Sequence, residues 1–571
     1  MALARSSSYE VQLYQVDHWV LDGRFEDEAE ARNHAKRILS GGKVEGYRIV
    51  RDWQRPDGRH IETELCSEFR AQSNALTISP IDEPPPVCRT VDQCYTVESR
   101  MVMNRLLRTY VERLVVTPTE IMHNYPELKR LLDKDNLVPT AVGRVAALQA
   151  EKAGLDGRER RDEMYRLVDA VTERARKASA RQDLPDVAKS GFGPAFEALS
   201  KKETPEDRTF YAKVLVSRDL VQMRNWLAKL DYLAGLVRED GGLAEEPLEL
   251  VDGIIADVLG APSVAQELLG MQRSLAEALC NLLDLSRGRL VADGRPDDDR
   301  ALMLSELLAF NDLDETRLVI LDLVRRQLRS AQPLYRNDPA AERDAFDAVL
   351  RRATGPDGML GGGGGMAEAL VQRYMRFLEA GGATGRRQSI NEVIARLPDA
   401  KDRVRFLLAL ADSDLGRQHA DDVTAALRQL TGDVTAVARF VSRDQPIKAN
   451  LEELTRLYRQ VAESTAPEPL RTTLAENIDD LLCAYIVGSR VVERLDNPDD
   501  ILRHRANRLI QLCAPGTLQS RKALDIVRQR VVAHLRQPNF EHRYIEDIVD
   551  PAVQQKALRD FFKLLGDAGF R

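Results

Sequence analysis

The helical spacing of apolar residues is the feature that most constrains the fold of this chain. From about Val97 to the C-terminus, apolar residues recur at three- and four-residue steps, the period of an amphipathic helix. Sequences typical of helix starts occur along this region, such as the capping box Thr117-Pro-Thr-Glu120 and the segment Thr204-Pro-Glu-Asp207. We expect on the order of twenty helices joined by short connections. The chain is therefore predicted to be mainly α, either a solenoid-like helical-repeat array or a multi-bundle array.

Two five-residue segments indicate internal repetition within the helical region. Leu275-Ala-Glu-Ala-Leu279 and Met366-Ala-Glu-Ala-Leu370 differ only in their first residue and lie 91 positions apart. Further matches at offsets of 91 and 86 define two candidate copies, residues 250–330 and 341–415. Self-similarity at a fixed spacing is typical of stacked helical units. Convergence is the alternative, because any two Ala- and Leu-rich amphipathic helices share matches at helical spacing.

The first seventy residues carry the different pattern of a small α+β module. Residues 9–16 alternate between apolar and polar, which is the period of a strand, and residues 19–21, 46–53 and 60–65 are predicted as further strands. A helix with Asp27 as its N-cap separates the two strand pairs, which gives the order ββαββ. The expected division of the chain is a module at 1–70, a Pro-rich linker at 71–92, and helical domains at 93–245, 246–420 and 421–571.

Charge and cysteine content limit the classes of partner and the cellular compartment that we expect for this chain. The net charge of −8 and the isoelectric point near 5.7 argue against a general nucleic-acid-binding protein, whose surface is normally basic. Six cysteines are scattered and only Cys88 and Cys94 are close, so free thiols in a reducing cytosol are expected. Neither an apolar signal segment nor a stretch of ~20 apolar residues occurs. With Arg in excess over Lys, these features predict a cytoplasmic bacterial protein without a membrane span.

A run of five glycines, from Gly361 through Gly363 to Gly365, is the most unusual local feature. A Gly-rich turn at a helix N-terminus can present backbone N–H groups to an anion. The lysine and hydroxyl residue of a P-loop do not follow the run, and no strand precedes it as in a dinucleotide-binding fold. A helix entry that needs close packing is the alternative. If the run does bind an anionic small molecule, the candidate counter-charges are Arg351, Arg352 and Arg373.

The sequence predicts no catalytic residue, no metal ligand and no cofactor. Eight histidines are spread out with no His-Glu-x-x-His motif. Carboxylate clusters fall mostly where helices begin, and capping explains their position there. A Gly-x-Ser-x-Gly nucleophile motif is also absent.

Aromatic residues near both ends of the chain are candidates for partner binding. Trp19, Tyr47 and Trp53 belong to the N-terminal module, where strand alternation requires that some of the aromatics form the core instead. Phe561 and Phe562 lie on an apolar helical stripe near the C-terminus. Such a stripe is typical of a docked capping helix or of a helix that binds a partner.

Helical arrays expose long surfaces and usually act by binding. We therefore expect a non-enzymatic scaffold or regulatory adaptor that acts through interaction with another protein. A sensor that binds an anionic small molecule at the glycine run is the first alternative, and an enzyme of an unfamiliar helical class is the second. The partner's identity and the oligomeric state are left open by the sequence.

Overall fold

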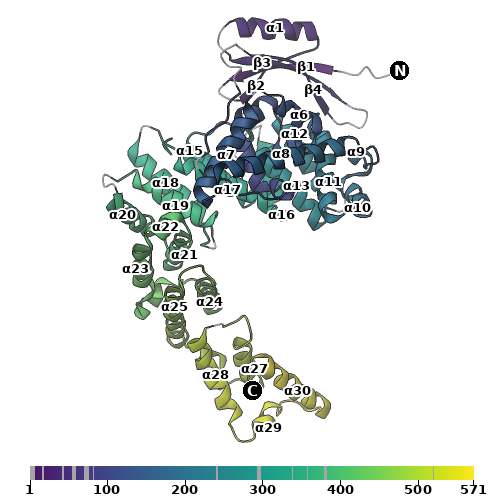
Figure 1. Cartoon of the computed structure of the whole chain (residues 1–571). Coiled ribbons are helices and arrows are strands. Elements are labelled where there is room, and N and C mark those ends of the chain that lie inside the picture. The colour runs from purple at the N-terminus through teal and green to yellow at the C-terminus, as the bar shows by residue number, and fades with distance from the viewer. Residues whose placement is uncertain are drawn as a thin grey trace. The chain divides into compact units, whose positions relative to one another are not determined.

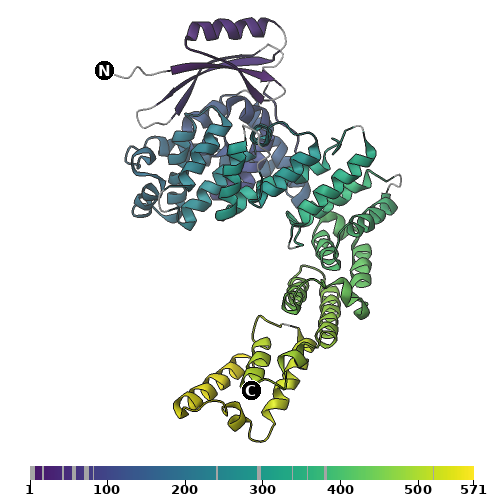
Figure 2. The same cartoon turned by 180° about the vertical axis from the view of Figure 1, so that it is seen from behind.

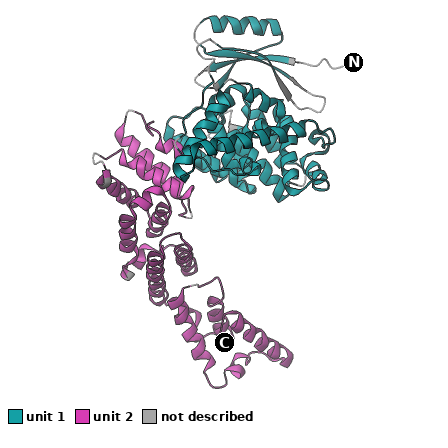
Figure 3. Cartoon of the chain, in the orientation of Figure 1, with its two compact units in different colours: residues 1–324 teal, residues 325–571 magenta. Residues whose placement is uncertain are grey.

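The computed structural model describes residues 7–15, 18–41, 44–54, 60–69, 76–81, 83–134, 136–239, 242–291, 298–336, 338–356, 358–378, 382–518 and 520–570. The chain forms two compact units, Met1–Val324 and Arg325–Arg571 (Figure 3). Across the described residues the fold has thirty α-helices, one 3-10 helix and one four-stranded sheet. The prediction of a mainly α chain with a small N-terminal α+β module is confirmed.

The N-terminal module is a four-stranded antiparallel sheet with one helix, in the predicted order ββαββ. Its elements are β1 (Ser7–Gln15), β2 (His18–Phe25), α1 (Glu28–Ser40), β3 (Gly46–Gln54) and β4 (His60–Phe69). The strands lie in the order β2-β1-β3-β4. Asp27 caps α1 as predicted, since its side chain accepts hydrogen bonds from the backbone N–H groups of Ala29 and Glu30.

Both faces of this sheet are covered. Strand alternation places Val11, Leu13 and Ile49 on the face that packs against α1, together with Ala31 and Ala35 of that helix. The opposite face rests on the helices of unit 1, as Figure 1 and Figure 2 show from two sides. Specific polar contacts tie the module to these helices. Trp19 Nε1 donates to the Arg113 carbonyl at 3.0 Å, and Arg48 Nη2 donates to the Arg224 carbonyl at 2.6 Å.

Unit 1 continues as a helical body. Its helices, including α17, which crosses into unit 2, are α2 (Val91–Cys94), α3 (Val97–Leu106), α4 (Arg108–Leu114), α5 (Pro118–His123), α6 (Tyr125–Leu132), α7 (Leu137–Ala153), α8 (Gly157–Ser179), α9 (Val187–Ser190), α10 (Phe192–Ser200), α11 (Pro205–Leu220), α12 (Trp226–Val237), α13 (Glu245–Leu259), α14 (Pro262–Leu269), α15 (Leu275–Ser286), α16 (Asp298–Phe310) and α17 (Asp314–Arg329).

Helix α5 lies at the centre of unit 1, and every one of its residues is buried. The predicted capping box forms, with the Thr117 and Glu120 side chains bonding each other's backbone N–H groups. The buried Glu120 carboxylate also accepts a hydrogen bond from Lys229 Nζ at 2.5 Å. A second buried pair joins Arg100 to Asp257, whose carboxylate also accepts from the Thr119 hydroxyl at 2.5 Å. These charges are therefore used to fix the packing of α3, α5, α12 and α13.

Unit 2 is a succession of helices. They are α18 (Pro339–Thr354), α19 (Gly363–Met375), α20 (Gly382–Ala395), α21 (Ala400–Ala411), α22 (Asp414–Gln418), α23 (Ala420–Thr431), the 3-10 helix η1 (Val434–Arg439), α24 (Ile447–Ala462), α25 (Glu468–Gly488), α26 (Val491–Leu495), α27 (Leu502–Leu512), α28 (Arg521–Leu535), α29 (Phe540–Tyr544) and α30 (Pro551–Asp567). Contacts run mainly between helices close in sequence, such as α19 with α20 and α21, and α24 with α25. Such local packing is the pattern of a helical array.

The number of helices exceeds the expected figure of about twenty. The difference comes from short helices such as α2 and α9, which have four residues each. A helix of about one turn is too short to display the 3.6-residue period. The predicted domain boundaries and the proposed duplication stay predictions; the two matching segments lie in α15 of unit 1 and α19 of unit 2.

Candidate functional site

Unit 1 contains a half-open apolar cavity of about 220 Å³, lined by helices α3, α5, α6, α7 and α8 and by the segment 85–94 that precedes them. The side chains that line it include Val102, Met103 and Leu106 of α3, Met122 of α5, Leu128 and Leu131 of α6, Val142 and Val145 of α7, and Met164, Leu167 and Val171 of α8. Apart from Gln149, Arg160, Ser99 and two cysteines, the lining side chains are hydrocarbon or thioether. The site is therefore suited to a molecule that carries little charge along most of its length.

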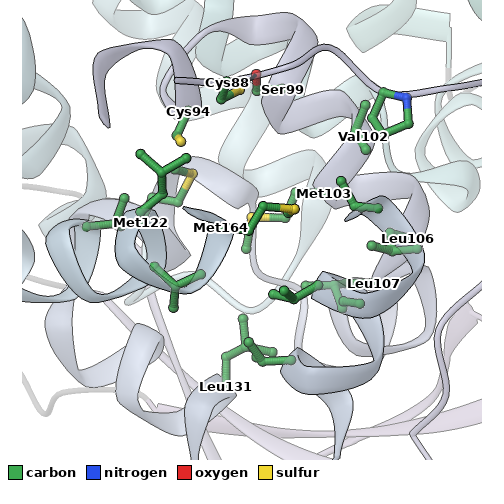
Figure 4. Close-up of a pocket in the computed structure, with 18 of the residues that line it drawn as sticks. Cys88, Cys94, Ser99, Val102, Met103, Leu106, Leu107, Met122, Leu131 and Met164 are labelled. Carbon is green, nitrogen blue, oxygen red and sulfur yellow. Dashed lines mark hydrogen bonds between the residues drawn. The ribbon is translucent and has the colours of Figure 1, made fainter. Parts of the chain in front are cut away.

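The cavity arises where the apolar stripes of these helices meet. Val138, Val142 and Val145 fall at the three- and four-residue steps of one face of α7, and the lining residues of α8 follow the same spacing. Three methionines contribute flexible thioethers to the lining. In Figure 4, Met103 and Met164 lie between the two cysteines at one end of the cavity and Leu131 at the other. Methionine side chains adapt readily to a bound molecule.

Cys88 and Cys94 line one end of the cavity and are each half-buried. Cys88 Sγ lies 3.2 Å from Ser99 Oγ and 3.5 Å from the Gln93 carbonyl oxygen. Cys94 Sγ lies 3.6 Å from the Thr90 carbonyl oxygen. The two thiols also interact, and each shifts the pKa of the other.

The pKa values of the two thiols are shifted in opposite directions. The interaction with Cys94, together with Ser99 and the Arg160 charge, lowers the pKa of Cys88 to about 6 against the effect of burial. The same interaction, together with burial, raises the pKa of Cys94. Cys88 is therefore the more acidic thiol of the pair.

Two buried polar residues hold the cysteine segment against α7 and α8. Arg160, only 2% exposed, donates from Nη2 to the Cys88 carbonyl at 2.8 Å and from Nε to Gln149 Oε1 at 2.7 Å. Gln149 Nε2 in turn donates to the Pro86 carbonyl at 2.5 Å. The described end of the predicted Pro-rich linker thus forms one wall of the cavity, and the position of Cys88 is fixed through its own backbone.

The glycine run, the predicted anion site, forms the start of α19. Gly362 and Gly363 adopt positive φ angles of 80° and 54°. A Cβ atom on Gly364 would lie 2.8 Å from the Ala409 carbonyl oxygen, so α19 and the end of α21 approach too closely for any side chain there. One on Gly365 would meet the Arg325 side chain at 3.1 Å. This close approach favours the packing interpretation of the run.

The three candidate arginines of that site have different surroundings. Arg373 is 1% exposed and donates to the carbonyls of Ser330 and Gln332 at 2.9 and 2.5 Å. Arg351 and Arg352 are exposed, and Arg351 Nε donates to the Asp347 carbonyl. These hydrogen-bond partners of Arg351 and Arg373 thus lie outside the glycine run, and anion binding there stays a prediction.

The candidate partner-binding aromatics are mostly engaged inside the fold. Tyr47 is 3% exposed and packs in the sheet core, while Trp19 donates to the Arg113 carbonyl of α4 and lies beneath the Arg48 guanidinium. The side chain of Trp53 lies outside the described residues. Phe561 is buried with its ring 4.4 Å from that of Tyr544, whereas Phe562 is 50% exposed. Phe562 is thus the best placed of the described four to meet a partner.

The cavity was not predicted from the sequence, although one signal was present. Cys88 and Cys94 are the only close pair of cysteines, and the residues between them include the capping box of α2, formed by Thr90 and Gln93. That box fixes the turn between the two cysteines, both of which line the cavity.

Comparison with known proteins gives no assignment for this site: the chain matches no protein-family model, no curated protein and no solved structure. In the described part of the chain, no three His, Cys, Asp or Glu side chains gather in a way that could hold a metal ion. The described helices also include none with the length and apolarity needed to cross a membrane.

Proposed function

We propose that this chain is a non-enzymatic regulatory adaptor of the bacterial cytoplasm that binds an apolar small molecule in unit 1 and another protein through unit 2. The observation that carries the proposal is the apolar cavity of about 220 Å³. An apolar cavity of about 150 Å³ stays dry and takes up benzene, which has six carbons. By proportion, the cavity of this chain suits a molecule with a chain of roughly nine carbons.

The cavity is half open, so solvent can reach its apolar lining when no ligand is bound. A bound hydrocarbon chain would remove that lining from water. Nine buried methylene groups contribute at most ~7 kcal/mol, an upper limit that corresponds to a Kd on the order of 10 µM.

The adaptor role is supported by the arrangement of unit 2. Its helices contact mainly their neighbours in sequence, and arrays of this kind present extended surfaces for other proteins. Exposed apolar residues on its last helices and their connections, including Phe562 and the 96% exposed Val549, are candidates for the contact. The net charge of −8 favours a protein partner over nucleic acid. A reducing cytoplasm would keep the six cysteines, all free thiols in the structure, in that state.

Isothermal titration of the full chain with 1-decanol tests the ligand-binding part. We expect saturable one-to-one binding by the wild-type chain and its loss in Val142→Phe, which places a ring in the cavity. Val487→Phe is the matched control, because Val487 is 63% exposed on a helix of unit 2. Equal heats from all three proteins, or no saturable binding by any, would refute ligand binding in the cavity.

The adaptor part is tested by cross-linking mass spectrometry on the tagged full chain in its host cells. Cross-links from one recurrent partner should map to unit 2 and weaken in Phe562→Ser. A partner linked only to the N-terminal module, or recurrent cross-links unaffected by Phe562→Ser, would contradict the assignment of the surface.

A further inference from the structure

We propose that Cys88 is an acyl-acceptor nucleophile: its sulfur takes an acyl group from an acyl thioester, and the acyl chain then occupies the apolar cavity. This inference rests on the proposed ligand-binding function and identifies the ligand as a medium-chain acyl group held as a thioester.

The position of Cys88 allows its sulfur to meet a reagent from solvent and to hold an acyl chain inside the cavity. Cys88 is half-buried and lines the cavity, so its sulfur can face a reagent from solvent and the apolar interior. In Figure 4 the cavity extends from Cys88 and Ser99 past Met103 and Met164 towards Leu131. An acyl group bound to this sulfur would place its polar carbonyl beside Ser99 and its chain among the methionines.

The surroundings of Cys88 are those of an activated thiol. Cys94 and Ser99, whose Oγ lies 3.2 Å from the Cys88 sulfur, both act to lower the pKa of the Cys88 thiol. The Arg160 guanidinium adds a positive charge and holds the Cys88 carbonyl at 2.8 Å. Because Arg160 is buried and also bonded to Gln149, it fixes the backbone that carries the nucleophile.

The reaction is an exchange of one thioester for another. The Cys88 thiolate attacks the carbonyl carbon of the acyl thioester and forms a tetrahedral intermediate. Its collapse breaks the original carbon–sulfur bond, and the departing thiolate takes a proton from water. No electron transfer occurs, and the acyl thioester is the only co-reactant.

The test is to incubate the full chain, kept reduced, with decanoyl-coenzyme A and to follow its intact mass. We expect the addition of one decanoyl group, its removal by hydroxylamine, and its location on Cys88 by peptide mapping. Cys88→Ser should lose the adduct, whereas Cys483→Ser, which alters a cysteine of unit 2, should keep it. An absent adduct, or one spread equally over several cysteines, would overturn the inference.

Two further measurements show whether binding of the acyl chain in the cavity speeds the transfer, or whether Cys88 simply reacts as an accessible thiol. Val142→Phe should slow decanoyl transfer at least tenfold and leave alkylation of Cys88 by iodoacetamide within about twofold. Cys94→Ala should move the midpoint of the pH–rate profile to higher pH, and Cys94→Ser, which keeps a hydroxyl donor, should restore it in part. Equal slowing of both reagents by Val142→Phe, or a profile unmoved by Cys94→Ala, would count against the assigned roles.

Titration of the wild-type chain with 1-decanol, which cannot form a thioester, distinguishes the two proposals. If 1-decanol binds and decanoyl transfer does not occur, the acyl-acceptor role is wrong and the ligand-binding function stands. If 1-decanol does not bind, the ligand-binding function fails, and any adduct on Cys88 reports thiol reactivity alone.

Discussion

Replacing Val142 by Phe tests whether the cavity offers real space to a side chain. Phe carries four more side-chain carbons than Val, and at ~0.8 kcal/mol per buried carbon their burial would contribute up to ~3 kcal/mol. In a filled core the same substitution forces off-rotamer packing and costs about 1–3 kcal/mol. Because Val142 lines a cavity of about 220 Å³, we expect Val142→Phe to stabilise unit 1 by on the order of 1–2 kcal/mol, after some loss to imperfect fit.

Tryptophan fluorescence during urea unfolding isolates this effect. All three tryptophans, Trp19, Trp53 and Trp226, belong to unit 1, so their signal reports the unfolding of that unit within the full chain. We expect a higher transition midpoint for Val142→Phe at an unchanged slope, and no change for Val487→Phe in unit 2. A midpoint lowered by the equivalent of 1 kcal/mol or more would refute the reasoning, because it would show that the space is not available to a ring.

Three further predictions concern the packing and electrostatics on which this account depends. Lys229→Met should destabilise unit 1 by about 3–5 kcal/mol in the same urea assay, because it leaves the buried Glu120 carboxylate uncompensated; the pair with Glu120→Gln should recover part of the loss, and additive losses would contradict the ion-pair argument. Burial lowers the pKa of Lys213 to about 7, below its value in the unfolded chain, so the wild-type chain should lose stability as the pH falls from about 10 towards 7. The Lys213→Met variant should lose less stability than the wild-type chain over the same pH range. Parallel stability–pH curves for the two proteins would show that Lys213 does not contribute to the pH dependence. Gly364→Ala should expose the α19–α21 contact to faster hydrogen exchange, because its Cβ would meet the Ala409 carbonyl; Gly488→Ala, which has open space around it, should leave exchange in that region unchanged.

The parts of the fold that sequence could predict are those set by local chemistry. Helical period, strand alternation and the caps at Asp27 and Thr117 depend on residues within a few positions of one another, and each appears in the structure as predicted. Short helices such as α2 were not predicted, because a single turn is too short to show the helical period. The partners of Glu120 and Asp257 could not be predicted, because Lys229 and Arg100 lie far away along the chain.

The cavity escaped prediction for a related reason. The apolar stripes of the helices include Val142, Met103 and Met164. The sequence of one stripe does not show whether the side chains of the opposing stripes fill the space between the helices. A void is a property of packed volumes, so it emerges only when five helices are assembled. The glycine run is the opposite case: its unusual composition predicted a ligand site, whereas the cavity residues predicted none. The structure instead places Gly364 at a close backbone contact.

The most direct test of the central claim is a crystal structure of the full chain soaked with 1-decanol. We expect continuous density for the alkyl chain between Met103, Met164 and Leu131, with the hydroxyl end next to Cys88 and Ser99. A cavity closed by the methionine side chains, or one occupied by hydrogen-bonded water molecules in the presence of the alcohol, would contradict it.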